Sequence, residues 1–247
     1  MIPTFGVYME QDNSIRINKY LSEVGFCSRR AADQLLEQKR ITINGKLPEL
    51  GTKVFPKDEV RVDGKLVGKP KQEHIYIAFN KPVGIVSTTD TKGEKNNIID
   101  YIGHPERIFP IGRLDKDSEG LILLTSEGDI VNKILRSKNN HEKEYIVTVD
   151  RPTDESFIRK MSSGIPILGT VTDPCKVERI NRFKFRIILT QGLNRQIRRM
   201  CEYLGYTVKQ LKRIRIMNIH LDLPVGKWRD LSDKELAVLN EMIEDSS

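Results

Sequence analysis

Residues 112–125 read Gly-Arg-Leu-Asp-Lys-Asp-Ser-Glu-Gly-Leu-Ile-Leu-Leu-Thr, a short polar segment that runs directly into an apolar one. Another apolar stretch, residues 108–111, precedes it and ends at the glycine. Short apolar runs bounded by turn residues are typical of buried strands. The pattern therefore predicts a short loop between two buried segments. This loop carries the carboxylate of Asp115, with Arg113 close by to keep it charged, and such a carboxylate is placed for chemistry.

The segments around this loop alternate irregularly between strands and helices. Ser232 and Glu235 form a capping-box pattern at the start of a last amphipathic helix. Irregular alternation favours an α+β domain with a central mixed or antiparallel sheet over a doubly wound parallel one. The predicted strands cover residues 75–79, 144–149 and 183–190, and the predicted helices cover residues 130–136, 154–161 and 195–204.

The N-terminal part of the chain has a different pattern. Apolar spacing after Arg16 and again after Ser28 predicts two short amphipathic helices. The Asn-Gly pair at 44–45 and the Asp-Gly pair at 63–64 predict tight hairpin turns in a small sheet. We therefore expect a flexible leader over 1–13, a first domain over 14–68, a linker over 69–75 and a second domain over 76–247.

The composition narrows the class of protein. The 247 residues include 41 Lys and Arg against 34 Asp and Glu, a net charge of +7. A basic balance suggests a polyanionic partner such as nucleic acid. The three cysteines and four histidines are scattered, without disulfide or metal-ligand spacing, so we expect a reduced, cytoplasmic protein without a metal. Neither a signal peptide nor an apolar run of membrane-spanning length is apparent.

Two residues outside the loop are candidates for chemistry. In the predicted helix 195–204, Arg198 lies beside an apolar stripe, so it is expected near the interior, where a guanidinium needs an anion. Asp115 is a plausible partner, and a fixed guanidinium keeps a carboxylate ionised. Spacing alone favours an ordinary structural ion pair. Tyr145 lies in a predicted apolar strand, where a core aromatic is the simpler interpretation and a ring stacking on a nucleobase the functional one.

The N-terminal pattern resembles the S4 RNA-binding domain. The resemblance rests on Arg-Ile-Asn-Lys-Tyr-Leu at 16–21, Cys-Ser-Arg-Arg-Ala-Ala at 27–32 and Ile-Asn-Gly-Lys at 43–46. It implies that one face of this domain grips an RNA phosphate backbone. The basic residues expected on that face are Arg16, Lys19, Arg29 and Arg30.

The second domain resembles the RsuA/RluB/RluE/RluF family of RNA pseudouridine synthases. The matching segments are the loop at 112–125, Lys-Glu-Tyr at 143–145, Gln-Ile-Arg-Arg-Met at 196–200, Asn-Lys-Pro-Val-Gly at 80–84 and Gly-Lys-Trp-Arg-Asp-Leu at 226–231. The resemblance covers nearly the whole chain. It implies a flipped uridine whose N1–C1′ bond breaks before C5 rejoins C1′, a reaction that needs no cofactor.

The resemblance also assigns roles to residues. Asp115 is the catalytic carboxylate, which attacks C1′ or C6 or acts as a base at C2′. Tyr145 stacks on the uracil, Arg198 holds the Asp115 carboxylate, and Arg113 takes the place of the extruded base. Further RNA contacts are implied at Lys143, Arg195, Arg199 and Leu211, the last as a pocket wall. Together with the basic residues between 195 and 215, the first domain would offer two surfaces for phosphate contacts.

Within that family, the segments at 141–145 and 192–202 look most like the RluF branch. This implies a uridine of 23S ribosomal RNA as the substrate, with a tRNA as a second substrate left open, and a monomeric enzyme. Some members carry a long basic C-terminal tail that is not found before Ser247, so one RNA contact fewer is expected. The alternatives are a non-catalytic S4-type RNA-binding or ribosome-assembly factor and, with little support, a two-carboxylate glycosidase.

Overall fold

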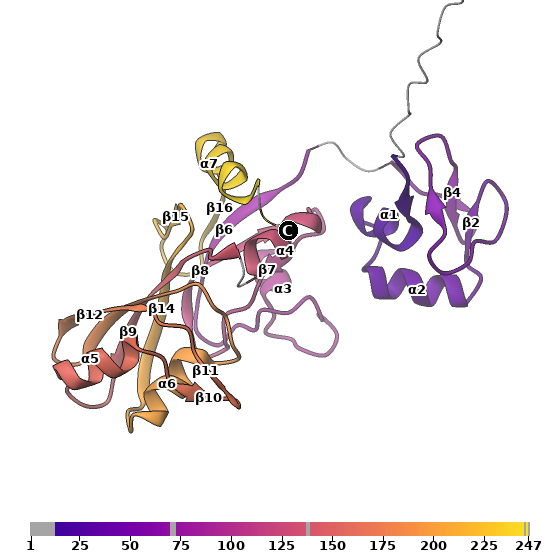
Figure 1. Ribbon diagram of the computed structural model, residues 1–247. Coiled ribbons are helices and arrows are strands. Elements are labelled where there is room, and N and C mark those ends of the chain that lie inside the picture. Colours follow the sequence, from indigo (N-terminus) through magenta and orange to yellow (C-terminus); the bar gives the residue numbers. More distant parts are fainter. Residues whose placement is uncertain (1–12, 70–72, 137–138, 245, 247) are drawn as a thin grey trace, which may run out of the picture. The chain divides into compact units, whose positions relative to one another are not determined.

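The computed structural model describes residues 13–69, 73–136, 139–244 and 246, and it divides into two compact units, Met1–Glu73 and His74–Ser247. Except for Asn13, the leader expected over residues 1–13 lies outside the described residues, and so do residues 70–72 of the expected linker. Figure 1 labels elements of both units along the chain.

The first unit contains two helices and short strands. Ser28 caps the second helix, because its Oγ accepts a hydrogen bond from the Ala31 amide at 3.1 Å. Gly25 follows the first helix with φ +78°, a conformation that glycine adopts without strain. The elements are β1 Ile15–Arg16, α1 Ile17–Glu23, α2 Arg29–Glu37, β2 Ile41–Ile43, β3 Lys53–Val54, β4 Val60–Val62 and β5 Lys65–Leu66.

The turns of this unit confirm the sequence prediction. Asn44 and Gly45 have φ values of +51° and +77°, and Asp63 and Gly64 have +50° and +76°. Positive φ at both central residues is the signature of a type I′ turn. The paired strands β2, β4 and β5 and the two helices enclose a core that includes Ile17, Leu21 and Ile41, all at most 1% exposed.

The second unit is built on a nine-stranded sheet in the order β12-β13-β9-β14-β8-β6-β16, with β7 and β15 paired to β8 and β14. Strands β14 and β8 pair in parallel and their neighbours pair antiparallel, so the expected mixed sheet is confirmed. The strands are β6 Tyr76–Lys81, β7 Phe109–Ile111, β8 Glu119–Thr125, β9 Lys143–Val149, β12 Lys176–Asn181, β13 Lys184–Leu189, β14 Val208–Ile216, β15 Ile219–His220 and β16 Trp228–Asp230. A separate hairpin joins β10 Pro166–Ile167 to β11 Thr170–Val171.

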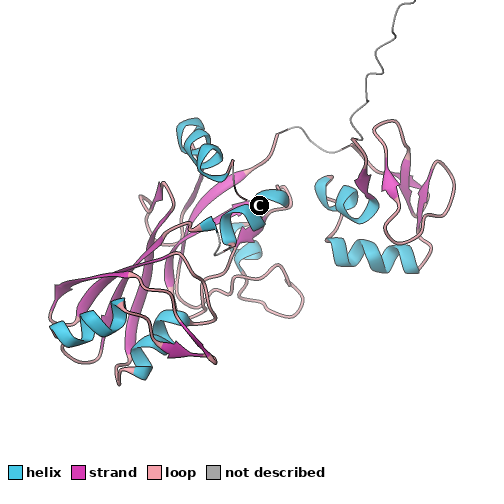
Figure 2. Cartoon of the chain, in the orientation of Figure 1, coloured by secondary structure: helices cyan, strands magenta, loops and turns pink. Residues whose placement is uncertain are grey.

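Helices lie against both faces of this sheet. Successive strand residues point to opposite sides, so a strand that is apolar throughout has an apolar surface to cover on each face. In β8, Ile122 and Leu124 pack into one core while Leu121 and Leu123 pack into the other. Figure 1 shows α5 and α6 beside the β9–β12 end of the sheet and α7 beside β16, and Figure 2 marks the helices apart from the strands. The helices are α3 Ile98–Ile102, α4 Asp129–Leu135, α5 Glu155–Ser162, α6 Gln196–Tyr203 and α7 Asp233–Ile243.

Strand β14 corrects the expectation of one continuous basic surface between residues 195 and 215. The strand occupies the middle of the sheet, so its side chains alternate between faces and several are buried. Arg213 is only 5% exposed. Arg215 is neutralised by Glu142 and Glu144, each 2.8 Å from its guanidinium. Neither arginine is free for a phosphate contact on a common surface.

Candidate active site

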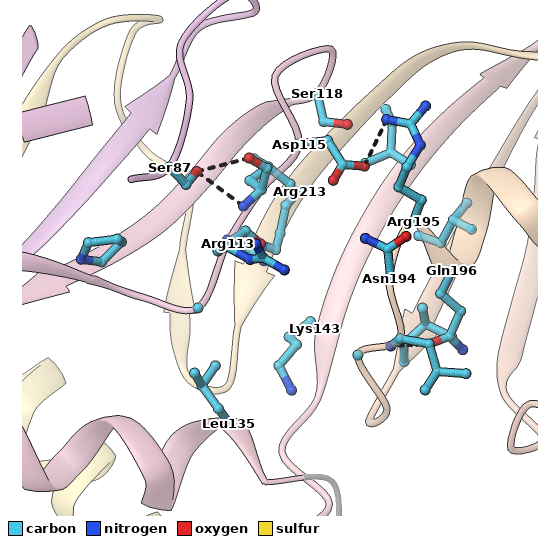
Figure 3. A pocket seen from close by; sticks show the side chains of 18 of the residues that line it. Ser87, Arg113, Asp115, Ser118, Leu135, Lys143, Asn194, Arg195, Gln196 and Arg213 are labelled. Atoms are coloured by element: carbon cyan, nitrogen blue, oxygen red, sulfur yellow. Dashed lines mark hydrogen bonds and ion pairs between the residues drawn. The ribbon is translucent and has the colours of Figure 1, made fainter. Parts of the chain in front are cut away.

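The loop between β7 and β8 opens onto a pocket of about 670 Å³ in the second unit. Its wall is formed by the Asp115 loop, by residues of β9 and β14, and by the segment that leads into α6. Figure 3 shows Asp115, Asn194 and Arg195 on neighbouring parts of this wall, with Lys143 further along it. The sequence-predicted residues that line the pocket are Arg113, Asp115, Lys143, Tyr145, Arg195, Arg198 and Leu211.

The backbone of the Asp115 loop is held at several points. Ser87 accepts a hydrogen bond from the Leu114 amide at 3.2 Å and donates one to the Leu114 carbonyl at 2.8 Å. The Ser118 amide donates to the Asp115 carbonyl at 3.0 Å, which closes a turn immediately after the carboxylate. Buried strands on both sides of the loop limit its movement further. Asp115 is therefore presented on a rigid frame, as the apolar–polar–apolar pattern predicts.

Two arginines approach the Asp115 carboxylate. Oδ2 of Asp115 lies 3.7 Å from Nη1 of Arg195 and 3.9 Å from Nε of Arg198. Both distances exceed hydrogen-bond length, so the attraction is electrostatic and the carboxylate oxygens stay free for a substrate. About a third of the Asp115 side chain is exposed, compared with 15% of Arg198. The site thus combines an accessible anion with a fixed cation behind it.

Arg198 also holds the loop itself. Its Nη2 donates to the Asp117 carbonyl at 2.9 Å and to Ser118 Oγ at 3.0 Å. The sequence interpretation linked Arg198 to the Asp115 carboxylate alone, and the contacts with the two residues beyond it were not anticipated. Because Ser118 is fully buried, this anchoring fixes the turn that follows Asp115.

Arg195 reaches the site through an unusual backbone conformation. Its φ of +49° places it in the left-handed region immediately before α6. Gln196 supports this segment, because its side chain accepts from the Leu193 amide at 3.0 Å and donates to Gln191 at 3.2 Å. The resulting turn directs Arg195 toward Asp115 and also toward Asp117, at 3.7 Å. A helical extrapolation from α6 alone would not have predicted this placement.

Two buried lysines add positive charge near the site. Lys143 lines the pocket and donates to the carbonyls of His141 at 2.9 Å and Thr190 at 3.3 Å. Burial, reinforced by Arg213, lowers its pKa to about 8. Lys81 is fully buried and donates to the carbonyls of Pro82 and Ile85. Burial lowers the pKa of Lys81 to about 8, against the opposing attraction of Asp115.

One other predicted residue of the second unit does not line the pocket. Arg199 contacts Asn194, with Nε 3.1 Å from the Asn194 carbonyl, and is not part of the pocket wall. In the first unit Arg16, Arg29 and Arg30 are exposed, whereas Lys19 forms an ion pair with Glu23 at 3.5 Å.

Sequence reasoning missed Ser87, Lys81 and Gln196, and it placed Arg213 among the basic residues expected to contact phosphate instead of in the pocket wall. Lys81 and Gln196 lie inside motifs that were already recognised, at 80–84 and 196–200, but no role was attached to either of them. Alternating basic and apolar residues over 213–216 were a signal for the strand that carries Arg213. Ser87 had no signal, because its hydrogen bonds depend on how the chain folds.

Within the described ranges, no group of three or more His, Cys, Asp or Glu side chains is arranged to hold a metal ion. Among the helices of those same ranges, none is both long and apolar enough to cross a membrane.

The fold and the site present a partly exposed carboxylate among cations in a pocket, and comparisons with known proteins identify the class of enzyme. The sequence profile of the RNA pseudouridylate synthase family matches residues 75–203, and that of the S4 domain matches residues 15–60. A crystal structure of a pseudouridylate synthase aligns with a TM-score of 0.67 and 29% identity, covering 92% of this chain and 100% of that chain.

Two relatives give a closer comparison. The dual-specificity RNA pseudouridine synthase RluF of Escherichia coli strain K12 is 59% identical over 241 residues, covering 97% of this chain and 83% of the relative. The ribosomal large subunit pseudouridine synthase B of Bacillus subtilis is 34% identical, covering 92% of this chain and 96% of the relative. The chain belongs to the RsuA/RluF family of RNA pseudouridine synthases. It is an enzyme that isomerises uridine in RNA.

Proposed function

We propose that this enzyme converts a uridine of 23S ribosomal RNA into pseudouridine in the cytoplasm, acting as a monomer, with Asp115 as its catalytic carboxylate. The name of the Bacillus subtilis relative supports a large-subunit substrate. The printed dual specificity of the Escherichia coli relative supports a second RNA, for which a tRNA is the candidate. The domains that bind this RNA are the S4 domain over residues 14–68 and the catalytic domain over 76–247.

One observation carries the proposal. Asp115 is the carboxylate of the pocket wall, it is partly exposed, and Arg195 and Arg198 approach it without forming hydrogen bonds. A carboxylate that acts on a nucleoside must stay ionised and unblocked, because it either attacks the sugar or base or removes a proton. The two guanidinium groups attract the carboxylate electrostatically, and their distance leaves its oxygens available.

The remaining pocket residues have roles around this carboxylate. Extruding a base from structured RNA costs a few kcal/mol, and contacts with the phosphate backbone offset that cost. Arg113, on the same loop, takes the place of the extruded uridine. Tyr145 stacks on the uracil once it is in the pocket, and Leu211 closes the wall beside it. Within the pocket the N1–C1′ bond breaks, the uracil turns, and C5 bonds to C1′.

The test is a pair of substitutions, Asp115→Asn and Asp115→Ala. We expect both variants to lose pseudouridine formation and to keep RNA affinity within about threefold, because the carboxylate contributes to chemistry rather than to phosphate binding. The measurement is tritium release from [5-³H]uridine-labelled 23S rRNA, since C5 loses its hydrogen when it bonds to C1′. Filter binding of the same RNA reports affinity.

The outcomes separate the competing functions. Isomerisation near the wild-type rate in Asp115→Ala would contradict the proposed role of Asp115. A wild-type protein that binds rRNA but releases no tritium from it would contradict the 23S substrate. Free uracil or free sugar among the products would point to a glycosidase. Pseudouridine mapping of rRNA and tRNA from cells lacking this protein then identifies the modified position.

A further inference from the structure

We infer that Arg213 is a positioning residue that holds the Asp115 loop and the Tyr145 ring in register with each other. Arg213 belongs to β14 and lines the pocket, but none of the sequence motifs attaches a role to it. The inference rests on the proposed roles of Asp115 and Tyr145. Its three supports are contacts of the guanidinium with the loop, a contact with the ring, and a close main-chain approach to β8.

The guanidinium binds the chain on both sides of Asp115. Nε of Arg213 donates to the Leu121 carbonyl at 2.6 Å, and Nη1 donates to the Arg113 carbonyl at 3.5 Å. Arg113 precedes the carboxylate and Leu121 follows it in β8, so one planar group spans the two ends of the loop. Arginine suits this task because its donors are arranged in a rigid fork.

The same guanidinium lies over the Tyr145 ring. The central carbon of the guanidinium is 5.9 Å from the ring centroid, and the two residues are paired across β14 and β9. Nη2 is buried and finds no hydrogen-bond partner among the described residues. The electron-rich ring face lies within cation–π distance of this guanidinium. Tyr145 itself remains partly exposed in the pocket wall, which leaves part of the ring for a base.

The main chain of Arg213 is clamped at the same place. Arg213 pairs with Gly120 in the parallel contact between β14 and β8. Gly120 has φ +109°, and a side chain there would collide with the Arg213 carbonyl and amide. The close approach that glycine permits brings the guanidinium within reach of Leu121. Main chain and side chain of Arg213 thus couple β8, β9 and β14 directly beneath the catalytic loop.

A purely structural role does not explain these contacts. Arg213 is 5% exposed, and its hydrogen-bond acceptors are main-chain carbonyls. A buried charge held in this way is costly, and an apolar side chain of similar volume often stabilises a core as well or better. A positioning role explains why a cation is kept here, because the Arg213 guanidinium fixes the loop and the Tyr145 ring relative to each other.

The experiment compares Arg213→Met and Arg213→Lys with Arg215→Met. Arg215 is the matched control, because it lies two residues further along β14 and forms its ion pairs with Glu142 and Glu144 outside the pocket. Each variant is measured by single-turnover tritium release from [5-³H]uridine-labelled 23S rRNA, by filter binding of that RNA and by thermal unfolding. Asp115→Ala on the same RNA tests the proposed function separately, because the Arg213 variants are judged by the ratio of their rates to wild type.

We expect Arg213→Met to lower the single-turnover rate about 100-fold, the effect of misplacing reacting groups by about 1 Å, while RNA affinity changes less than about threefold. Arg213→Lys should recover less than about a tenth of the lost rate, because an ammonium group cannot span both carbonyls and the ring. Arg215→Met should keep its rate within about threefold even where it loses stability.

Three results would overturn the inference. The first is an Arg213→Met rate within about threefold of wild type. The second is an equal loss of rate and of RNA affinity in Arg213→Met, which would indicate a direct RNA contact. The third is a loss of rate in Arg215→Met as large as that in Arg213→Met. If Arg213→Met does not fold, Arg213→Lys decides: a loss of about tenfold or more at unchanged affinity supports the inference, and a rate within about threefold of wild type contradicts it.

Discussion

Asp115 lies in a pocket whose other ionisable side chains are mostly cations. Arg195 and Arg198 stand within 4 Å of it, and the buried amine of Lys143 lines the same wall. Such an arrangement suits a polyanionic substrate. Each of these cations has its own contacts, so single substitutions can distinguish their contributions.

Arg198 should not tolerate the conservative change to lysine. Arg198→Lys keeps the charge but loses the simultaneous reach to Asp117, Ser118 and the Asp115 carboxylate, so we expect kcat to fall about 10- to 100-fold with little change in KM. Tritium release at varied RNA concentration gives both constants. Arg199→Lys is the control, because Arg199 contacts Asn194 but does not itself line the pocket or contact the Asp115 loop. A kcat within about threefold of wild type would show that the charge of Arg198 suffices.

Lys81 makes the stability of the second unit depend on pH. Its pKa of about 8 in the folded state lies below the ordinary 10.5, so between these values the unfolded chain binds more protons and stability rises with pH. Relative to Lys81→Met, the wild type should gain about 2 kcal/mol from about pH 7 to about pH 9.5. Urea unfolding followed by the single tryptophan, Trp228 of β16, measures this.

The Lys81 comparison has a clear contrary outcome. Lys143 has a similarly lowered pKa, but it is present in both proteins and its contribution cancels in the difference. A stability difference that stays constant over this pH range would mean that the Lys81 amine is protonated equally in the folded and unfolded states.

At the scale of elements, the contact between β8 and β14 organises the site. It is the parallel contact in an otherwise antiparallel sheet, and it joins the strand after Asp115 to the strand of Leu211 and Arg213. Because β8 begins directly after the Asp115 loop, its parallel pairing with β14 brings Arg213 next to the end of that loop. Gly120 is the residue that permits their close approach.

Gly120→Ala should therefore destabilise the second unit. Alanine must adopt φ near +109° and its Cβ meets the main chain of Arg213, so we expect a loss of at least about 2 kcal/mol in the free energy of unfolding. Gly192→Ala is the control, since nothing lies within 4 Å of its added Cβ. Trp228 fluorescence during urea unfolding reports both variants. Equal stability of the two would show that the strands can separate at little cost.

At the scale of the whole molecule, part of the positive charge of the chain is already neutralised by ion pairs. Many cations are already paired, as Arg40 is with Asp63 at 2.6 Å and Arg215 is with Glu142 and Glu144. The net charge of +7 therefore overstates the surface that can meet phosphate. The exposed arginines of the first unit, Arg16 and Arg30 among them, are better candidates for that contact.

The double change Arg16→Ala and Arg30→Ala should weaken rRNA binding and lower the slope of log affinity against log salt by about 1 to 2, because about one counterion is released per phosphate contact. The rate of the bound complex should not change. Arg40→Ala is the matched control, because Asp63 already holds that guanidinium. Filter binding over a series of salt concentrations measures the slope. An identical slope in the double variant and wild type would move the phosphate contacts elsewhere.

Local patterns were sufficient for much of the fold. Ser28, Ser232 and the two Asn-Gly and Asp-Gly turns predict element ends correctly, because caps and turns depend on residues only a few positions apart. Strands 143–149 and 184–189 and helix 196–203 were predicted to within a residue or two. Strand β14 was not, because its basic residues suggested a surface when its alternation was the relevant signal.

The sequence by itself determined the α+β class, the rigid loop that carries Asp115, and the family, because these follow from local periodicity and from motifs that are contiguous in the chain. Only the tertiary structure decided that Arg195 lies as close to Asp115 as Arg198 does, that Arg215 is neutralised, and that Arg213 lies beneath Tyr145. Those relations join residues about 70 to 80 positions apart, and strand pairing and burial, which no local pattern encodes, bring them together.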